Sequence, residues 1–295
     1  METPPVCNYE NSDYQSSFWE HGGREYEDAV EAVALKRLLP ASGKRLLELG
    51  AGAGRNTPRY AGYKEIVLLD YSRTQLEQAH QRLGDNPAYR YVAADIYHLP
   101  FVANLFDGAT MIRTLHHMVD PRAALCQVRS TLQGGAIFIL EFANKKNIKS
   151  ILRYTLGQQH WNPFSPEPIE FAPLNFDFHP ATVKAWLTEC GFASNAWLTV
   201  SHFRVNWLKR LLPLRFLVGM DSLLQPTGGW LQFTPSIFVR SRVMGPAAIA
   251  EEGAFFKCPA CGAILVDTPP EIICPSCKAI FPVENGIYDF RIKSA

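Results

Sequence analysis

The sequence predicts an α/β protein with a doubly wound, mostly parallel sheet of seven strands and a small cysteine-bearing domain at the C-terminal end. The first observation is an apolar run at residues 46–49 that leads into glycines at every second position, 50, 52 and 54. Such a run is typical of a buried parallel strand that enters a tight turn. The second is that further apolar runs alternate with segments of helical spacing, as in parallel sheets. The third is a pair of Cys-x-x-Cys sequences after residue 255.

Composition sets broad limits on the function. The chain has 295 residues, 47% of them hydrophobic, and a net charge of +1. This length predicts one large or two modest domains, and the near-neutral charge does not favour nucleic acid as a partner. The N-terminal residues are polar and include Pro4 and Pro5, unlike a signal peptide, and no apolar run is long enough to cross a membrane. We therefore expect a cytoplasmic protein.

Hydrophobic spacing and breaker residues place the individual elements. We expect helices at residues 28–39, 72–83, 121–132 and 181–190. We expect strands at residues 46–49, 65–70, 89–94, 105–112, 136–142, 197–205 and 236–243. These elements lie in a domain of residues 28–244, preceded by an N-terminal arm or lid at 1–27 and followed by a linker at 245–254 and a last domain at 255–295.

Two insertions interrupt the alternation of strands and helices. Residues 143–178 are rich in proline and aromatic residues and show no obvious regular structure. Connections of this length are usually functional or mobile, although a rigid cover over the sheet edge is the alternative. Residues 207–231 begin with an apolar segment, 207–225, that carries scattered basic residues, as interfacial helices do. The more common explanation is a helix that buries its apolar face on its own protein.

The glycine turn has the pattern Glu-x-Gly-x-Gly-x-Gly, from Glu48 to Gly54. Glycine permits close backbone approach to a ligand and positive φ. The pattern resembles motif I of the class I S-adenosylmethionine (SAM) methyltransferases, which have a Rossmann-like fold. The resemblance implies that Glu48, Gly50, Ala51 and Gly52 lie at the cofactor, with Glu48 near its methionine amino group. A glycine-rich turn without a ligand is the alternative.

Two further acids follow predicted strands. Asp70, with Tyr71 after it, ends the second strand, where a carboxylate can accept the ribose hydroxyls of a nucleotide. Capping of the next helix is the alternative for Asp70. The family resemblance implies that Asp95 meets the adenine amino group and that Ile96 packs on the ring. A carboxylate suits that amine donor, but a simple turn aspartate is the alternative.

The fourth strand is followed by Arg113, Thr114, His116 and His117. Ligands bind at the carboxyl ends of strands in open α/β sheets. Arg113 and Thr114 are therefore candidate cofactor neighbours, and the two histidines are candidate catalytic groups on the acceptor side. We expect at most one of the adjacent histidines to face the pocket, and a core or helix-starting histidine is an equal alternative.

Four of the seven cysteines form two Cys-x-x-Cys pairs, Cys258 with Cys261 and Cys274 with Cys277. This spacing predicts a closed, structural tetrahedral Zn²⁺ site; two disulfides or a rubredoxin-like iron are the alternatives. The tail resembles the small zinc-ribbon proteins that bind and activate methyltransferases. The other cysteines are Cys7, Cys126 and Cys190, which we expect to be small buried or half-buried side chains.

Together these features predict a SAM-dependent methyltransferase with a structural zinc ribbon. The resemblance extends to the ubiquinone, menaquinone and small-molecule methyltransferases, and the aromatic insertion suits an apolar small-molecule, quinone or lipid-like acceptor. Peripheral membrane contact is compatible with the apolar segment at 207–225, whereas nucleic acid is not favoured. The alternatives are an RNA methyltransferase, suggested by the ribbon, and a non-catalytic SAM-binding scaffold.

Overall fold

A ten-stranded sheet runs through the whole molecule. The structure is a computed structural model and describes residues 4–7, 9, 10, 12 and 23–292. The strands of the sheet are β1 (Gly43–Leu49), β2 (Tyr63–Asp70), β3 (Tyr89–Ala93), β4 (Phe106–Met111), β5 (Leu132–Ala143), β8 (Phe192–Val200), β9 (Ser236–Val243), β12 (Glu271–Ile273), β13 (Ile280–Glu284) and β14 (Ile287–Asp289). Their order is β12-β13-β14-β3-β2-β1-β4-β5-β9-β8, with β3, β2, β1, β4 and β5 parallel to one another.

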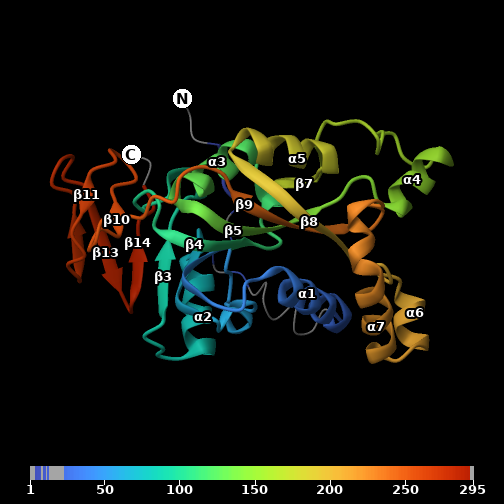
Figure 1. The fold of residues 1–295 in the computed structure, drawn as a ribbon, viewed down its shortest axis with the longest axis horizontal. Coiled ribbons are helices and arrows are strands. Elements are labelled where there is room, and N and C mark those ends of the chain that lie inside the picture. Colours follow the sequence, from blue (N-terminus) through green and yellow to red (C-terminus); the bar gives the residue numbers. More distant parts are fainter. Residues whose placement is uncertain (1–3, 8, 11, 13–22, 293–295) are drawn as a thin grey trace.

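Helices cover both faces of this sheet (Figure 1). The helices are α1 (Glu25–Leu38), α2 (Arg73–Leu83), α3 (Pro121–Thr131), α4 (Ile148–Thr155), α5 (Pro180–Glu189), α6 (Asn206–Leu211) and α7 (Leu214–Leu224). Apolar residues of α1, α2 and α7 pack in one buried cluster, and those of α3 and α5 pack in a second cluster on the other face. The fold is the predicted Rossmann-like, doubly wound sheet.

Strand order places four carboxyl ends side by side. Leu49 at the end of β1 is paired with Leu69 of β2 and with Met111 of β4, while Asp70 is paired with Ala93 of β3. The chain order reverses between β1 and β4, and ligands bind at such switch points. The loops that follow these strands therefore converge on one site.

The element boundaries differ most from the prediction in two strands. The strand expected at 197–205 is β8, which begins at Phe192, directly after the positive-φ Gly191, and ends before Ser201, which also has positive φ. β5 begins at Leu132, where the helix α3 has just ended, rather than at residue 136. In both places the connection from helix to strand is shorter than expected: it has two residues before β8 and none before β5.

Both insertions contain regular structure. The first holds α4 and a hairpin of β6 (Ile169–Ala172) and β7 (Asn175–Asp177), so the expectation of no regular structure at 143–178 was wrong. The second holds α6 and α7, which Pro213 separates by serving as the N-cap of α7. No helix in the described ranges is long and apolar enough to span a membrane.

The C-terminal module extends the sheet. It contains the hairpin of β10 (Phe256–Lys257) and β11 (Ile264–Leu265) and the three strands β12, β13 and β14. β14 pairs in parallel with β3, so the seven predicted strands are joined by three more. Phe256 and Phe290 of the module are buried in the same apolar cluster as Phe101. This packing joins the module closely to the sheet.

Cys126 is half-buried and Cys190 is buried, as predicted, but the sequence did not predict that they pair. A disulfide joins Cys126 on α3 to Cys190 at the end of α5, with the two Cα atoms 4.9 Å apart. The two helices lie side by side on one face of the sheet (Figure 1). Because the cysteines are 64 residues apart in the sequence, no local pattern indicates that they meet. Cys7 is free and half-buried, as predicted.

Candidate active site

A cavity of about 100 Å³ lies at the carboxyl ends of β1 to β4. Its lining comprises Val6, Cys7, Tyr9, Gly50, Gly52, Leu69, Asp70, Tyr71, Gln75, Ala94, Ile96, Arg113, Thr114, His117 and Met118. Small-molecule sites usually enclose about 300–1,000 Å³. The N-terminal segment lies across this cavity through Val6, Cys7 and Tyr9, so the segment must shift to admit a nucleotide-sized ligand.

The glycine turn leaves room beside the backbone. Gly50 and Gly52 both have positive φ, at 65° and 52°. A Cβ atom on Gly50 would lie 2.1 Å from Thr114 Oγ1, whereas one on Gly52 would meet only Gln75 Oε1, at 3.9 Å. Glycine is therefore required at position 50 because a side chain there would clash with Thr114. At position 52 the space beside the backbone is open on the cavity side. Ala51 lies between them but is buried and does not line the cavity.

Asp70 ties the second strand to the glycine turn. Its carboxylate accepts hydrogen bonds from the Gly52 N–H at 2.8 Å and from the Ser72 N–H at 2.9 Å. Burial raises the pKa of Asp70, although these two backbone donors oppose the shift. Ser72 caps α2 with its own hydroxyl. The alternative, that Asp70 caps α2, therefore does not apply. Asp70 lines the cavity together with Tyr71.

Glu48 and Asp95 do not line the cavity. Glu48 is buried beneath the turn, where Thr57 Oγ1 donates to it at 2.7 Å. Burial raises the pKa of Glu48 to about 8. Asp95 caps the short helix η3 (Ile96–His98) by accepting from the Tyr97 N–H at 2.9 Å. This contact agrees with the alternative interpretation of Asp95 as a simple turn aspartate. Ile96, directly after it, does line the cavity.

Arg113 enters the cavity from a buried charge cluster. Its backbone has positive φ, and its N–H donates to the Glu141 carboxylate at 2.9 Å. Its guanidinium donates to Glu31 of α1 through Nε at 2.6 Å, and Arg55 binds the same carboxylate at 2.8 Å. Burial alone would raise the pKa of Glu31, but these two arginines outweigh it and hold that pKa below its usual value. Glu31 therefore fixes both arginines near the glycine turn.

Of the two adjacent histidines, His117 lines the cavity and His116 does not. His117 Nδ1 lies 3.1 Å from the Leu174 carbonyl oxygen, which can only accept, so Nδ1 carries the proton. Nε2 is then an acceptor, and it receives the Tyr9 hydroxyl at 3.1 Å. Burial lowers the pKa of His117, which favours this neutral form. Its Nε2 atom is thus a base that Tyr9 covers.

Sequence reasoning missed the residues that line the cavity from outside the motifs. Val6, Cys7 and Tyr9 come from the N-terminal segment, and their nearest signal was the aromatic character of that segment. Tyr14, a candidate contact in the same segment, lies outside the described residues. Gln75 is in the first turn of α2, the helix that follows β2. Because the carboxyl end of β2 borders the cavity, this first turn could have been predicted to line it.

A wider cleft of about 750 Å³ is lined by the first insertion and by the segment just before α6. Its lining includes Trp161 and Phe171, together with Asp177 and Arg204. Burial raises the pKa of Asp177 to about 6, against the opposing charge of Arg204. Arg204 and Lys149 also line a neighbouring hollow beside α6, so the cleft and the hollow adjoin on the side of α4 and α6.

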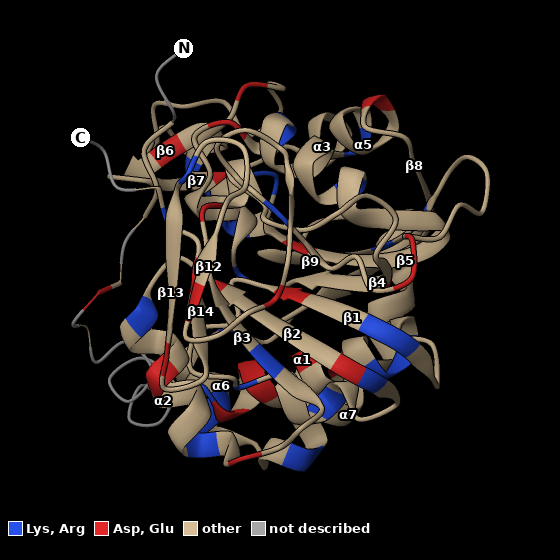
Figure 2. Cartoon of the chain, turned by 90° about the vertical axis from the view of Figure 1, so that its left-hand side faces the viewer, with Lys and Arg blue, Asp and Glu red and all other residues tan. Residues whose placement is uncertain are grey.

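The C-terminal module gathers its four cysteines. One sulfur atom from each of Cys258, Cys261, Cys274 and Cys277 lies within 4.8 Å of all the others, a spacing that suits a single tetrahedral metal ion. Acidic and basic residues are both present around β12 to β14, so this end of the molecule has no strongly basic surface (Figure 2).

The module also reaches the cavity through Arg291. After β14, Arg291 is held by Asp289 at 2.6 Å and donates to the Tyr71 carbonyl oxygen at 3.3 Å. It also contacts the Glu10 carboxylate at 3.3 Å. Glu10 in turn accepts from the Thr74 hydroxyl at 2.9 Å. The module, the N-terminal segment and the second strand therefore meet at one edge of the cavity.

Comparison with known proteins agrees with this geometry. Residues 47–140 match the family model described as a methyltransferase domain. A demethylmenaquinone methyltransferase of Clavibacter sepedonicus is 29% identical over 184 residues, which cover 57% of this chain and 73% of that protein. An O-methyltransferase of Penicillium expansum is 36% identical over 133 residues, which cover 42% of this chain and 48% of that protein.

Solved structures show the same fold. A SAM-dependent methyltransferase structure from Listeria monocytogenes aligns with a TM-score of 0.54 at 19% identity, covering 75% of this chain and 99% of that one. At this identity the likeness establishes the fold alone, while the matched domain and the sequence relatives bear on the reaction. On this combined evidence, the chain is a SAM-dependent methyltransferase.

Proposed function

We propose that this enzyme transfers a methyl group from SAM to an apolar small-molecule acceptor of the quinone or lipid-like kind. The observation that carries the proposal is the cavity at the switch point between β1 and β4, where Gly52 and Asp70 face open space from adjacent strand ends. The lining supplies a carboxylate for hydroxyl groups and apolar surface from Ile96 and Leu69 for an aromatic ring.

We assign the parts of the cofactor to parts of this lining. Asp70 would accept the ribose hydroxyls, Ile96 would pack on the adenine, and Arg113 and Thr114 would border the methionine end. Glu48 and Asp95 would act from behind the lining, because they hold the turn and the loop through Thr57 and Tyr97.

Calorimetric titration with SAM tests the assignment of Asp70. Asp70→Asn should weaken binding by about 1–3 kcal/mol, because it removes a charged acceptor. Asp85→Asn is the matched control, since its side chain is 98% exposed and remote from the cavity lining. Unchanged affinity in Asp70→Asn, or a folded wild type that binds no SAM, would remove the assignment.

His117 is the residue we propose to take up the acceptor proton. SAM, when bound, would supply an electrophilic methyl group on a sulfonium. The acceptor must lose a proton as it gains the methyl group, and the unprotonated Nε2 of His117 is placed to receive it. Because Tyr9 donates to this atom, its hydroxyl must move away or pass the proton onward. Exclusion of water by the N-terminal segment would complete the site.

The acceptor class rests on the wider cleft and on the relatives. Trp161 and Phe171 of the first insertion place two aromatic side chains in the lining of this cleft. The relatives are named for demethylmenaquinone and for O-methylation, both of which involve apolar or hydroxylated small molecules. Transfer of labelled methyl groups should be measured to demethylated quinones and phenols, with tRNA and rRNA transcripts in parallel. Transfer to RNA alone would contradict the proposal.

We further propose that the four cysteines bind a structural Zn²⁺. All four ligands come from the chain, which leaves no position for a substrate. The module has few residues of its own for a core, so the metal would supply part of its stability. Metal analysis of the purified protein should give one zinc per chain, lost on substitution of Cys261 and Cys277.

A further inference from the structure

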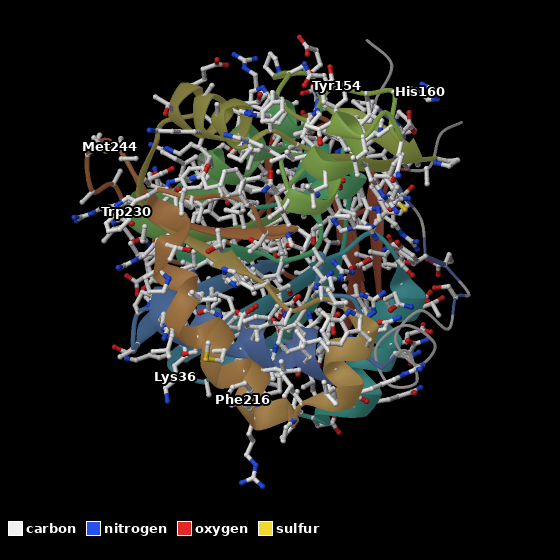
Figure 3. All side chains as sticks on the ribbon, turned by 90° about the vertical axis from the view of Figure 1, so that its right-hand side faces the viewer. Lys36, Tyr154, His160, Phe216, Trp230 and Met244 are labelled. Carbon is white, nitrogen blue, oxygen red and sulfur yellow. A yellow bond between two sulfur atoms is a disulfide. The ribbon has the colours of Figure 1, made fainter. Side chains whose placement is uncertain are left out.

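Apolar side chains are concentrated on one end of the molecule. This end face consists of residues 146–156, with α4, and residues 205–233, with α6 and α7. Of the 24 large hydrophobic side chains that are exposed in the described chain, 14 lie in these two ranges. The most exposed include Trp230 at 90%, Leu223 at 75% and Leu211 at 70%. Tyr154, Trp230 and Phe216 all appear on this end and span it from top to bottom (Figure 3).

The two ranges form one continuous surface. The Ile148 N–H donates to the Phe233 carbonyl oxygen at 2.8 Å, and Lys146 Nζ lies 5.8 Å from the Phe233 ring centre. Lys149 of α4 and residues 205–211 line the same hollow. In Figure 1, α4 lies at the upper part and α6 and α7 at the lower part of the same end of the molecule, opposite the cysteine module.

The exposed apolar residues are not the packing face of these helices. α7 already buries Leu217 and Asp221, and the Tyr26 hydroxyl of α1 donates to Asp221 at 2.6 Å. Four of its other large apolar side chains, Leu214, Phe216, Met220 and Leu223, are exposed, whereas Val218 is half-buried against the core. The helix is therefore apolar on two sides, and only one of them is covered by the described chain. We expected the segment to bury its apolar face on its own protein. α7 does so on one side only.

The charges of the end face have one sign. Lys149, Arg153, Arg210 and Arg215 are exposed, and none of them is paired with a carboxylate in the described residues. The two ranges contain a single acid, Asp221, and it is fully buried. A protein partner complementary to the end face would need a surface that is both strongly acidic and apolar. An anionic lipid bilayer offers both properties together.

The arrangement of these residues fits the interface of a bilayer. On α4, Ile148 and Leu152 are one helical turn apart, and Lys149 and Arg153 repeat at the same spacing beside them. Such basic amphipathic helices lie in the plane of the interface, where Trp rings are also enriched. Trp207 and Trp230 are the exposed tryptophans of this face.

We propose that the end face docks on the surface of an anionic lipid bilayer. The apolar side chains would enter the headgroup region, and the four cations would contact lipid phosphates. The cleft with Trp161 and Arg204 opens beside this face, so a lipid-like acceptor would reach it from the membrane. That last step rests on the proposed function, whereas docking itself does not.

Vesicle flotation tests the docking. The probes are vesicles of phosphatidylcholine alone and of equal parts phosphatidylcholine and phosphatidylglycerol. The wild type should float with the anionic vesicles, and added salt should weaken this binding. Arg210→Glu with Arg215→Glu should reduce the affinity at least about five-fold for each charge removed. Trp207→Ser with Leu211→Ser and Trp230→Ser should reduce it at least about ten-fold.

Matched controls lie elsewhere on the surface. Lys44→Glu with Lys64→Glu changes two exposed cations on β1 and β2, and Ile249→Ser with Val266→Ser changes two exposed apolar residues. Both controls should float as the wild type does. Thermal unfolding of every variant should match the wild type, because all the altered side chains are exposed.

Several outcomes would overturn docking on a bilayer. One is a wild type that does not float with anionic vesicles. Another is equal flotation of the end-face variants and their controls. A third is self-association of the wild type, measured by light scattering, that the tryptophan and leucine variant abolishes while no vesicles are bound. SAM binding and methyl transfer are measured in separate assays. A negative flotation result would therefore contradict the docking without contradicting the proposed function.

Discussion

Glu31→Gln should be among the most damaging single changes near the cavity. Glu31 is fully buried and neutralises two half-buried arginines, Arg55 and Arg113. Glutamine keeps the shape and one acceptor oxygen but removes the charge, so both guanidiniums lose their shared counterion. Removing one partner of a buried ion pair costs about 3–5 kcal/mol, and we expect the lower end because the neighbouring Glu141 and Asp28 remain.

Thermal or urea unfolding at pH 7 measures this effect. A loss of about 3 kcal/mol should lower the melting temperature by about 6–12 °C. Glu25→Gln, an exposed acid on the same helix, is the control and should change stability by less than about 0.5 kcal/mol. SAM affinity should also fall in Glu31→Gln, because Arg113 lines the cavity. A variant as stable as the control, with unchanged SAM binding, would refute the role assigned to this cluster.

The pH dependence gives the same prediction an independent check. The pKa of Glu31 in the folded state lies below its ordinary value of 4.5. Its ionised form therefore stabilises the fold above that value, and this contribution is lost as the pH falls through the folded-state pKa. The stability difference between wild type and Glu31→Gln should be constant near neutrality and narrow below about pH 4.5.

Three further predictions concern the rim of the cavity and the metal. Arg291→Ala should weaken SAM binding about ten-fold in calorimetry, since it removes the donor to Tyr71; an unchanged dissociation constant would show that the module does not shape the cavity. His117→Asn should abolish the acid limb of the pH–rate profile, which for the wild type should lie below pH 6.5 because burial lowers the His117 pKa; a limb that persists would assign it to another group. Removal of metal by a chelator should lower the melting temperature, because Phe256 and Phe290 share the core of the large sheet, and chelation that leaves stability intact would oppose a structural zinc.

The sequence alone was sufficient for the fold and for much of the cavity lining. The alternation of apolar runs and helical segments is local, and the carboxyl ends of parallel strands must share an edge. Gly52, Asp70 and Ile96 could therefore be predicted to lie together before any contact was known, and all three line the cavity. The Cys-x-x-Cys pairs are equally local, and their four sulfur atoms do meet.

Other features of the site depend on contacts between residues that are distant in the sequence. Glu31 on α1 meets Arg113 across 82 residues, and Tyr9 meets His117 across 108. Neither pair follows from spacing, because each depends on how a helix or the N-terminal segment lies on the finished sheet. The same reason explains why the pairing of Cys126 with Cys190 was not foreseen.

Exposure is the property that only the tertiary structure decided. Periodicity identifies an apolar helix but does not say which of its sides the rest of the chain covers, as residues 207–225 show. In α7 the fold buries Leu217 and leaves Leu223 in solvent. The sequence by itself thus determined the seven strands of the large domain, the glycine turn and the cysteine cluster, because these follow from local chemistry. The folded chain determined the buried charge cluster, the covered histidine and the end face, because these arise only where distant segments pack.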